Sequence, residues 1–257
     1  MIFNSKKKKK IGLALGGGAA LGAAHIGVLK AIDEFDIPVH YVAGTSIGAF
    51  VGAFYAFGKT WQEIEDFARD LDWFDVSRLS LSKYGLLSNK KMNSLFRKIL
   101  GDVTFEDAKI PLAMVAVDIC TGQKAILKSG NIATAVMAST CIPGVFIPVD
   151  SEDKLLVDGG IMENVPVATV SEMGAKTIIG VDLLGRHAYK KPGNIVDILI
   201  NTINISIENS TKLQTGDGNI IIAPDLSAYN IIDTDQTDGL IEAGYTEARK
   251  VLNHHFG

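Results

Sequence analysis

The stretch Tyr41-Val42-Ala43-Gly44-Thr45-Ser46-Ile47-Gly48-Ala49 places a serine between a short apolar run and the helix-like run 49–57. A strand, a sharp turn and a helix form the setting in which hydrolases hold a nucleophilic serine. We expect such a turn to bring Gly44 and Gly48 together and to leave no room for side chains there. In a chain with 26 glycines the pattern alone is weak, so it needs support from the rest of the sequence.

Short apolar runs rich in β-formers alternate with amphipathic stretches of helix length. The predicted strands are 11–15, 41–43, 112–117, 124–127, 155–157, 177–181 and 220–223. The predicted helices are 23–35, 49–57, 61–71, 91–100, 132–139, 167–173, 195–213 and 239–253. Such alternation predicts an α/β fold, a three-layer α/β/α sandwich whose central sheet is mostly parallel.

The composition fits one large domain. The chain has 257 residues, of which 47% are hydrophobic, and we expect a single domain over residues 11–257 behind a basic arm, 1–10. A net charge of -4 offers no broad footprint for nucleic acid, and two cysteines fit a reducing cytoplasm. We expect the lysines of the arm to be solvated, with peripheral docking on an anionic membrane as the open alternative.

The apolar run after these lysines imitates a signal peptide. Six glycines between Gly12 and Gly27 would make a poor signal helix, so we expect a strand that leads into a glycine turn. The sequence contains no uninterrupted run of 18 apolar residues, so we expect no membrane-spanning helix.

Residues 58–109 carry no strand signal. We expect them to form a helical lid or cap insertion, in which residues 79–87 are a partly apolar loop between two helices. A lid that faces lipid and an ordinary helical cap packed on the sheet are equally compatible with this stretch.

A serine nucleophile needs donors for the oxyanion, and Gly16-Gly17-Gly18 is the candidate for them. The three glycines follow the first predicted strand and open a helix, so backbone N–H groups converge there, at the same sheet edge as Ser46. A nucleotide phosphate loop is the less favoured interpretation, because no Lys-Ser/Thr pair follows.

The serine also needs a base, and none of the five histidines has a convincing setting. His25 falls inside an apolar helix, where we expect it to pack or to form a hydrogen bond. A histidine triad also fits badly because only one strand precedes the elbow strand. Asp158-Gly159-Gly160 ends an apolar run, and its carboxylate could face Ser46, although a plain turn is the alternative for these three residues taken alone.

Taken together, the glycine loop, the serine motif and the Asp-Gly-Gly motif resemble the patatin-like phospholipase family. The match covers most of residues 11–183 and includes Ala24-His25-Ile26-Gly27, Ala138-Ser139, Ile142-Pro143-Gly144 and Asn164-Val165-Pro166. The segment after Leu184 contains no motif that we can interpret.

The resemblance implies a Ser–Asp dyad in which Ser46 is the nucleophile and Asp158 the base. It implies hydrolysis of acyl esters of phospholipids or lysophospholipids, without a cofactor or metal. The oxyanion hole would be formed by backbone amides of Gly16, Gly17, Gly18 and Ala19. The motif glycines would be Gly22, Gly44, Gly48, Gly159 and Gly160.

The sequence departs from the family pattern at Ala19 and Leu21. The family loop usually has glycine at the first of these positions and a basic residue at the second. If position 19 requires a positive φ, alanine costs about 1 kcal/mol there. A lipid-binding or regulatory protein with weakened catalysis is therefore one alternative, and an acyltransferase that uses the same serine is another.

Overall fold

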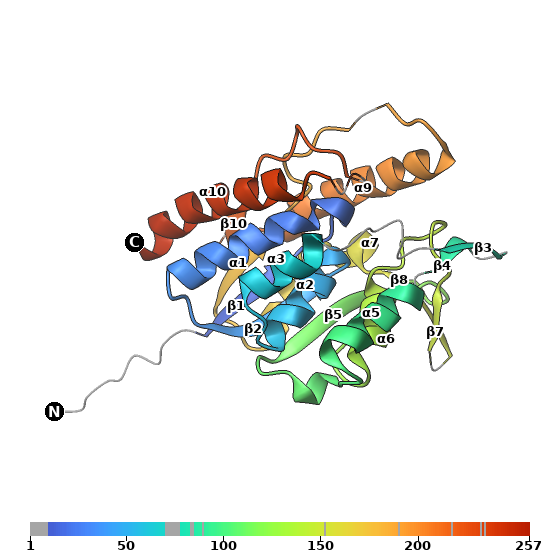
Figure 1. Cartoon of the computed structure of the whole chain (residues 1–257), viewed down its shortest axis with the longest axis horizontal. Coiled ribbons are helices and arrows are strands. Elements are labelled where there is room, and N and C mark those ends of the chain that lie inside the picture. The colour runs from blue at the N-terminus through green and yellow to red at the C-terminus, as the bar shows by residue number, and fades with distance from the viewer. Residues whose placement is uncertain are drawn as a thin grey trace.

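The computed structural model describes residues 10–69, 78–82, 85–88, 90–151, 153–189, 191–216, 218–231, 233 and 235–257, and only the backbone over 78–92. The predicted arm, apart from Lys10, lies outside these residues. Within them, eight strands form one sheet in the order β10-β9-β1-β2-β5-β8-β7, with β6 beside β5 (Figure 1). The strands are β1 Ile11–Leu15, β2 Val39–Thr45, β5 Leu112–Asp118, β6 Gln123–Leu127, β7 Val149–Ser151, β8 Lys154–Asp158, β9 Thr177–Val181 and β10 Ile220–Ile222.

The sheet is mixed. The five strands from β10 to β5 run parallel, whereas β6 and β8 pair antiparallel with β5, and β7 pairs antiparallel with β8. The predicted α/β fold with a mostly parallel sheet is therefore confirmed. Strand β7 was missed because three residues are too few for a clear alternation of polar and apolar side chains.

Helices cover both faces of the sheet. They are α1 Ala24–Glu34, α2 Ile47–Ala56, α3 Trp61–Arg69, α5 Lys90–Leu100, α6 Ile132–Ser139, α7 Gly160–Glu163, α8 Val167–Glu172, α9 Ile195–Gln214 and α10 Thr237–Phe256, with short 3-10 turns η1 at Ala19–Ala23 and η2 at Phe105–Asp107. On β1, Leu13 and Leu15 join the large core shared with α1, α2 and α10, while Ala14 joins a smaller core with α8. Alternate side chains of β1 thus point to opposite faces of the sheet, and each face packs against a different set of helices.

Helix α2, which follows the serine, is apolar on nearly all sides. Nine of its ten residues are buried, including Phe50 and Phe54, whose rings contact each other edge to face. In Figure 1 it lies in the middle of the molecule, below α3 and in front of the sheet. A helix that is hydrophobic all round is typical of such a position.

The stretch 58–109 is not purely helical. Between α3 and α5 the backbone forms an antiparallel hairpin of β3 Arg78–Ser82 and β4 Gly85–Ser88, where we expected a loop. Lys83 and Tyr84, at its turn, lie outside the described residues. Serine, leucine and glycine dominate this stretch, and they give no clear strand signal. Whether the insertion acts as a lid stays a prediction.

In the part of the chain that the structure describes, no helix has the length and hydrophobicity needed to cross a membrane.

Helices α1 and α10 pack backbone against backbone at two glycines. A Cβ on Gly27 would lie 1.9 Å from the carbonyl oxygen of Ile241, and a Cβ on Gly244 would lie 2.1 Å from that of Ala24. Both contacts are with main-chain atoms, so a side-chain movement cannot relieve them. Glycine at these positions therefore sets how closely α10 approaches α1.

Gly27→Ala should destabilise the protein by about 2 kcal/mol or more, because the added methyl group forces the two helices apart. Urea unfolding followed by circular dichroism measures the change. Gly193→Ala is the control, since a Cβ there meets its nearest atom, the Oδ2 of Asp197, at 3.4 Å. Equal midpoints for Gly27→Ala and wild type would show that the helices separate at little cost.

Candidate active site

Ser46 lies on the turn between the last residue of β2 and the first residue of α2. Its φ of 54° and ψ of -126° are strained for a non-glycine residue, at a cost of about 1–3 kcal/mol. A Cβ on Gly44 would lie 2.5 Å from the carbonyl oxygen of Gly48, as expected for a sharp elbow. A Cβ on Gly48 would lie 2.0 Å from the carbonyl oxygen of Leu15, so this glycine makes room for strand β1.

Hydrogen bonds from two directions hold the strained turn. The carbonyl oxygen of Ser46 accepts from the N–H groups of Ala49 at 2.9 Å and Phe50 at 3.2 Å. The Ser46 N–H donates to Ser139 Oγ at 2.9 Å, and that hydroxyl donates to the carbonyl oxygen of Val115 at 2.7 Å. Buried Ser139 of α6 thus connects the elbow to β5. The sequence motif contained Ser139, but nothing in the sequence indicated this role.

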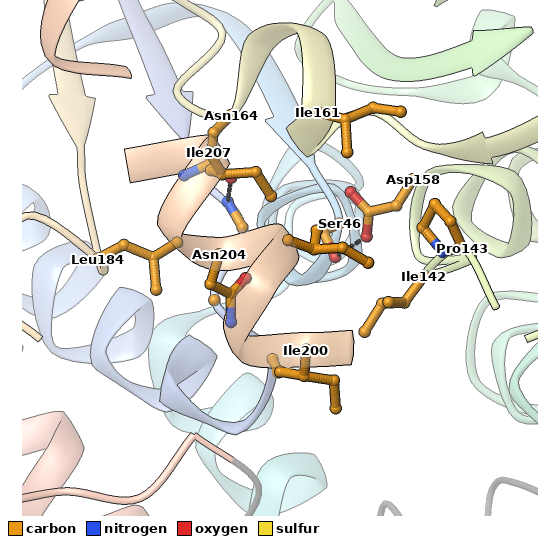
Figure 2. Close-up of a pocket in the computed structure, with 14 residues that line it drawn as sticks. Ser46, Ile142, Pro143, Asp158, Ile161, Asn164, Leu184, Ile200, Asn204 and Ile207 are labelled. Carbon is orange, nitrogen blue, oxygen red and sulfur yellow. Dashed lines mark hydrogen bonds between the residues drawn. The ribbon is translucent and has the colours of Figure 1, made fainter. Parts of the chain in front are cut away.

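The structure brings Ser46 and Asp158 together. Ser46 Oγ donates a hydrogen bond to Asp158 Oδ2 at 2.5 Å (Figure 2). The second carboxylate oxygen accepts from the Gly160 N–H at 2.8 Å. The two residues are 8% and 6% exposed. A Cβ on Gly159 would lie 2.3 Å from the carbonyl oxygen of Val115, so glycine lets the chain pass close to β5 after the aspartate.

The dyad meets because β5 pairs with both of its supporting strands. Strand β2 runs parallel to β5 and pairs Thr45, the residue before the serine, with Val115. Strand β8 runs antiparallel and pairs Asp158 with Ala116, the next residue of β5. Strands β2 and β8 therefore approach β5 from opposite directions and end beside adjacent residues of it. This brings Ser46 close to Asp158.

Burial raises the pKa of Asp158 to about 6, and the hydrogen bonds from the Ser46 hydroxyl and the Gly160 N–H oppose this shift. An aspartate with this pKa is still ionised at neutral pH. It is also a stronger base than an exposed aspartate, which is what removal of a serine proton requires.

The glycine loop offers fewer free donors than the sequence suggests. The Gly16 N–H donates to the carbonyl oxygen of Val181 at 3.1 Å, and the Gly17 N–H donates to Asn164 Oδ1 at 3.1 Å. For Gly18 and Ala19, the structure shows no acceptor of the N–H among the described residues. Of the four predicted oxyanion residues, these two have amides available for a substrate.

The peptide between Gly16 and Gly17 is clamped from both sides. The carbonyl oxygen of Gly16 accepts from His25 Nε2 at 2.8 Å, opposite the bond from the Gly17 N–H to Asn164. Burial lowers the pKa of His25 to about 4, so the ring is neutral and carries its proton on Nε2. We expected His25 to pack or to form a hydrogen bond inside its helix; it is buried and forms its hydrogen bond with the loop that precedes the helix.

The two departures from the family pattern have different structural consequences. Ala19 has a φ of 49°, so the backbone strain expected from alanine is present. Leu21 is fully buried in the large core, where a basic side chain would be costly. A Cβ on Gly22 would lie 2.0 Å from Ile47 Cγ1, which shows how closely the loop packs against the elbow helix.

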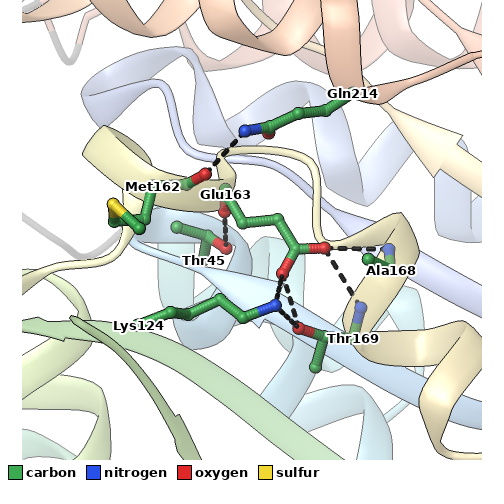
Figure 3. Close-up of polar contacts among 7 residues, drawn as sticks. All are labelled: Thr45, Lys124, Met162, Glu163, Ala168, Thr169 and Gln214. Carbon is green, nitrogen blue, oxygen red and sulfur yellow. Dashed lines mark hydrogen bonds and ion pairs between the residues drawn. The ribbon is translucent and has the colours of Figure 1, made fainter.

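A buried acidic side chain fastens the segment that follows Asp158. Glu163, 3% exposed, accepts from Lys124 Nζ at 2.7 Å and from Thr169 Oγ1 at 2.6 Å (Figure 3). It also accepts from the N–H groups of Ala168 and Thr169 at the start of α8. Its carbonyl oxygen accepts from Thr45 Oγ1 at 2.9 Å, which connects the segment to the residue before Ser46.

A pocket opens over the dyad, and its lining comes partly from the segment after Leu184. Ile142, Pro143 and Ile161 lie on the Asp158 side, whereas Asn164 and Leu184 lie on the other (Figure 2). Helix α9 crosses the pocket and contributes Ile200, Ile203, Asn204 and Ile207.

The contribution of α9 was missed in the sequence, although a signal was present. The buried positions of the helix are Ile200, Asn204, Ile207 and Thr211, at the spacing of one helix face. An asparagine at a core position of an amphipathic helix is unusual.

Asp158→Asn should stabilise the folded protein at neutral pH. The pKa of Asp158 is higher in the folded protein than in the unfolded chain, so ionisation of this carboxyl group destabilises the folded state. This cost is absent below about pH 4, grows as the pH rises through 6 and reaches about 3 kcal/mol at neutral pH. Urea unfolding at about pH 4 and about pH 7 measures the difference. Asp118→Asn is the control and should lower the stability at neutral pH, because the hydrogen bond from the Thr121 hydroxyl lowers the pKa of Asp118. A variant no more stable than wild type at neutral pH would contradict the raised pKa.

Comparison with known proteins supports the arrangement. The sequence pattern of the patatin-like phospholipase family matches residues 13–170. An uncharacterized NTE family protein of Mycobacterium bovis is 37% identical over 182 residues, which are 70% of this chain and 50% of the relative. Human patatin-like phospholipase domain-containing protein 6 is 36% identical over 181 residues, 67% of this chain and 13% of the relative. The lysophospholipase NTE1 of Eremothecium gossypii is 35% identical over 179 residues, 67% and 12% of the two chains.

Solved structures share the fold at low sequence identity. VipD from Legionella pneumophila superposes with a TM-score of 0.59 at 15% identity, over 96% of this chain and 67% of that one. ExoU of Pseudomonas aeruginosa, in complex with SpcU, gives 0.56 at 15% identity, over 96% and 53%. The chain spans about half the length of the mycobacterial relative, and much less of the human and fungal ones. The resemblance seen in the sequence is confirmed, and the chain belongs to the patatin-like phospholipase family.

Proposed function

We propose that the protein is a serine acyl hydrolase that cleaves carboxylic ester bonds of phospholipids or lysophospholipids through the Ser46–Asp158 dyad. The observation that carries the proposal is the 2.5 Å hydrogen bond from Ser46 Oγ to Asp158 Oδ2 at the start of a buried helix. Family membership supports a lipid substrate, and one relative bears the name lysophospholipase.

In the first half of the reaction, Asp158 accepts the proton of Ser46 while Oγ attacks the carbonyl carbon of the ester. The negative charge that develops on the carbonyl oxygen is stabilised by the N–H groups of Gly18 and Ala19. When the tetrahedral intermediate collapses, Asp158 returns the proton to the departing alcohol. The acyl group then remains on Ser46 as an ester.

In the second half, water takes the place of the alcohol. Asp158 removes one proton from the water as its oxygen attacks the acyl carbon, and it then protonates Ser46 Oγ as the fatty acid leaves. One carboxylate therefore serves both steps, and its two oxygens are divided between the serine and the Gly160 N–H.

The walls of the pocket support an acyl chain as the group next to the serine. Ile142 and Ile161 lie on the Asp158 side, and Ile200 and Ile207 of α9 cover the site (Figure 2). An apolar wall with a few polar groups is typical of a site that orients a largely hydrophobic ligand.

Ser46→Ala and Asp158→Asn should each lower kcat/KM at least about a thousandfold for release of fatty acid from a lysophospholipid or a p-nitrophenyl ester. In wild type, kcat/KM should rise with pH up to about 6, because the base is active only when Asp158 is ionised. Ser206→Ala, at an exposed position of α9 that does not line the pocket, is the matched control. Substantial activity in either dyad variant would refute the proposal.

A weakened or regulatory member of the family is the second candidate, and the positive φ of Ala19 favours it. Ala19→Gly should remove the backbone strain, raise stability by about 0.5–1 kcal/mol and leave the Ser46 elbow intact. If the alanine limits catalysis, the glycine variant should react faster with a fluorophosphonate probe than wild type does. Equal rates of Ser46 labelling in wild type and Ala19→Gly would show that the alanine does not limit catalysis. Absence of labelling in both proteins would favour a binding role.

A further inference from the structure

Two buried amide groups in the pocket have donors without acceptors. Asn164 is 1% exposed and Asn204 is 9% exposed, and both line the same cavity as Ser46. Within the described part of the chain, neither Nδ2 atom has a hydrogen-bond partner. A buried donor without an acceptor destabilises a folded protein, so a ligand that supplies the acceptor would be bound with a corresponding gain.

The orientation of Asn164 is determined by its neighbour. Its Oδ1 accepts from the Gly17 N–H at 3.1 Å, and only the oxygen of an amide can accept. The Nδ2 group must therefore be the end of the amide that remains for another partner.

Asn204 has the same property in a different setting. It lies on the buried face of α9, between Ile200 and Ile207, where an apolar side chain would pack without any unpaired polar atom. Leucine has the same branched shape and the same number of side-chain heavy atoms as asparagine. A polar group at such a position is explained by a ligand that pairs with it.

The two amides lie on the same side of Ser46, among apolar side chains such as Leu184 and Ile207 (Figure 2). Asn164 and Asn204 lie on the Leu184 side of Ser46, whereas Asp158 lies on the opposite side with Ile142. An ester placed on the serine has two unlike parts, an apolar acyl chain and an alcohol that carries oxygens. The isoleucines that line the pocket match the first part, and the two amides match the second.

We propose that Asn164 and Asn204 form a subsite that donates hydrogen bonds to the oxygen atoms of a glycerol group next to the scissile ester. This assignment rests on the proposed function, because it places the alcohol portion of that substrate. Neutral amide donors suit hydroxyl and ester oxygens of glycerol, which monoacylglycerols and lysophospholipids share. The phosphate of a lysophospholipid is not needed for this contact.

The test compares three esters of one short fatty acid: a monoacylglycerol, a lysophosphatidylcholine and a p-nitrophenyl ester. Asn204→Leu should lower kcat/KM about tenfold for both glycerol esters and less than about twofold for the p-nitrophenyl ester, which has no glycerol. Asn209→Leu, an exposed asparagine of the same helix, should change none of the three values. Equal losses on all three esters, or a loss confined to the lysophospholipid, would overturn the glycerol assignment.

A binding measurement decides the subsite without turnover. In the Ser46→Ala background, Asn204→Leu should weaken binding of the monoacylglycerol about tenfold by calorimetry, and Asn209→Leu should not. The midpoint of thermal unfolding should not fall in Asn204→Leu, because the change removes an unpaired donor. Unchanged monoacylglycerol binding would refute the subsite even if the dyad is active. Hydrolysis that persists in Ser46→Ala would refute the dyad, while the binding result would still decide the subsite.

Discussion

The hydrogen bond between Ser46 and Asp158 depends on the pairing of β5 with two strands of opposite direction. Strand β5 is buried along its whole length, and its residues Val115 and Ala116 pair with Thr45 and Asp158. A slip of one residue in β8 would turn the aspartate side chain to the other face of the sheet. The distance between Ser46 and Asp158 is therefore a consequence of strand register, which the core enforces at both neighbours of β5.

The groups that support the dyad act on the backbone and not on the reacting atoms. Ser139 holds the N–H of Ser46, and Thr45 holds the carbonyl oxygen of Glu163 on the short helix after Asp158. Glu163 itself is tied to α8 and to Lys124. The segment after Asp158 is thus tied to the residue before Ser46, and Ser46 itself is tied to α6 and β5, which explains how a strained serine can be held at one position.

Much of this site could be predicted from the sequence, because its parts are local. The elbow around Ser46 and the glycine loop are continuous motifs, and Asp158 ends a run with clear strand character. The direction of β8 could not be predicted, since side-chain alternation is the same in parallel and antiparallel strands. The helix that contributes Asn204 was predicted, but its place over the pocket depends on contacts distant in sequence. The Gly17 N–H looked available because its partner, Asn164, lies far along the chain.

Several features that reduce stability are concentrated in this one pocket. Ser46 and Ala19 have positive φ values, Asp158 is buried with a raised pKa, and Asn164 and Asn204 have unpaired donors. Each has a simple replacement that would stabilise the fold, such as glycine at the strained positions or an apolar residue for a buried amide. Strained backbone and buried polar groups gathered around a single hydroxyl are typical of a functional site. Under the proposed function, an ester substrate would supply acceptors for the unpaired donors: its oxyanion for the loop N–H groups and its oxygen-bearing alcohol for the two amides.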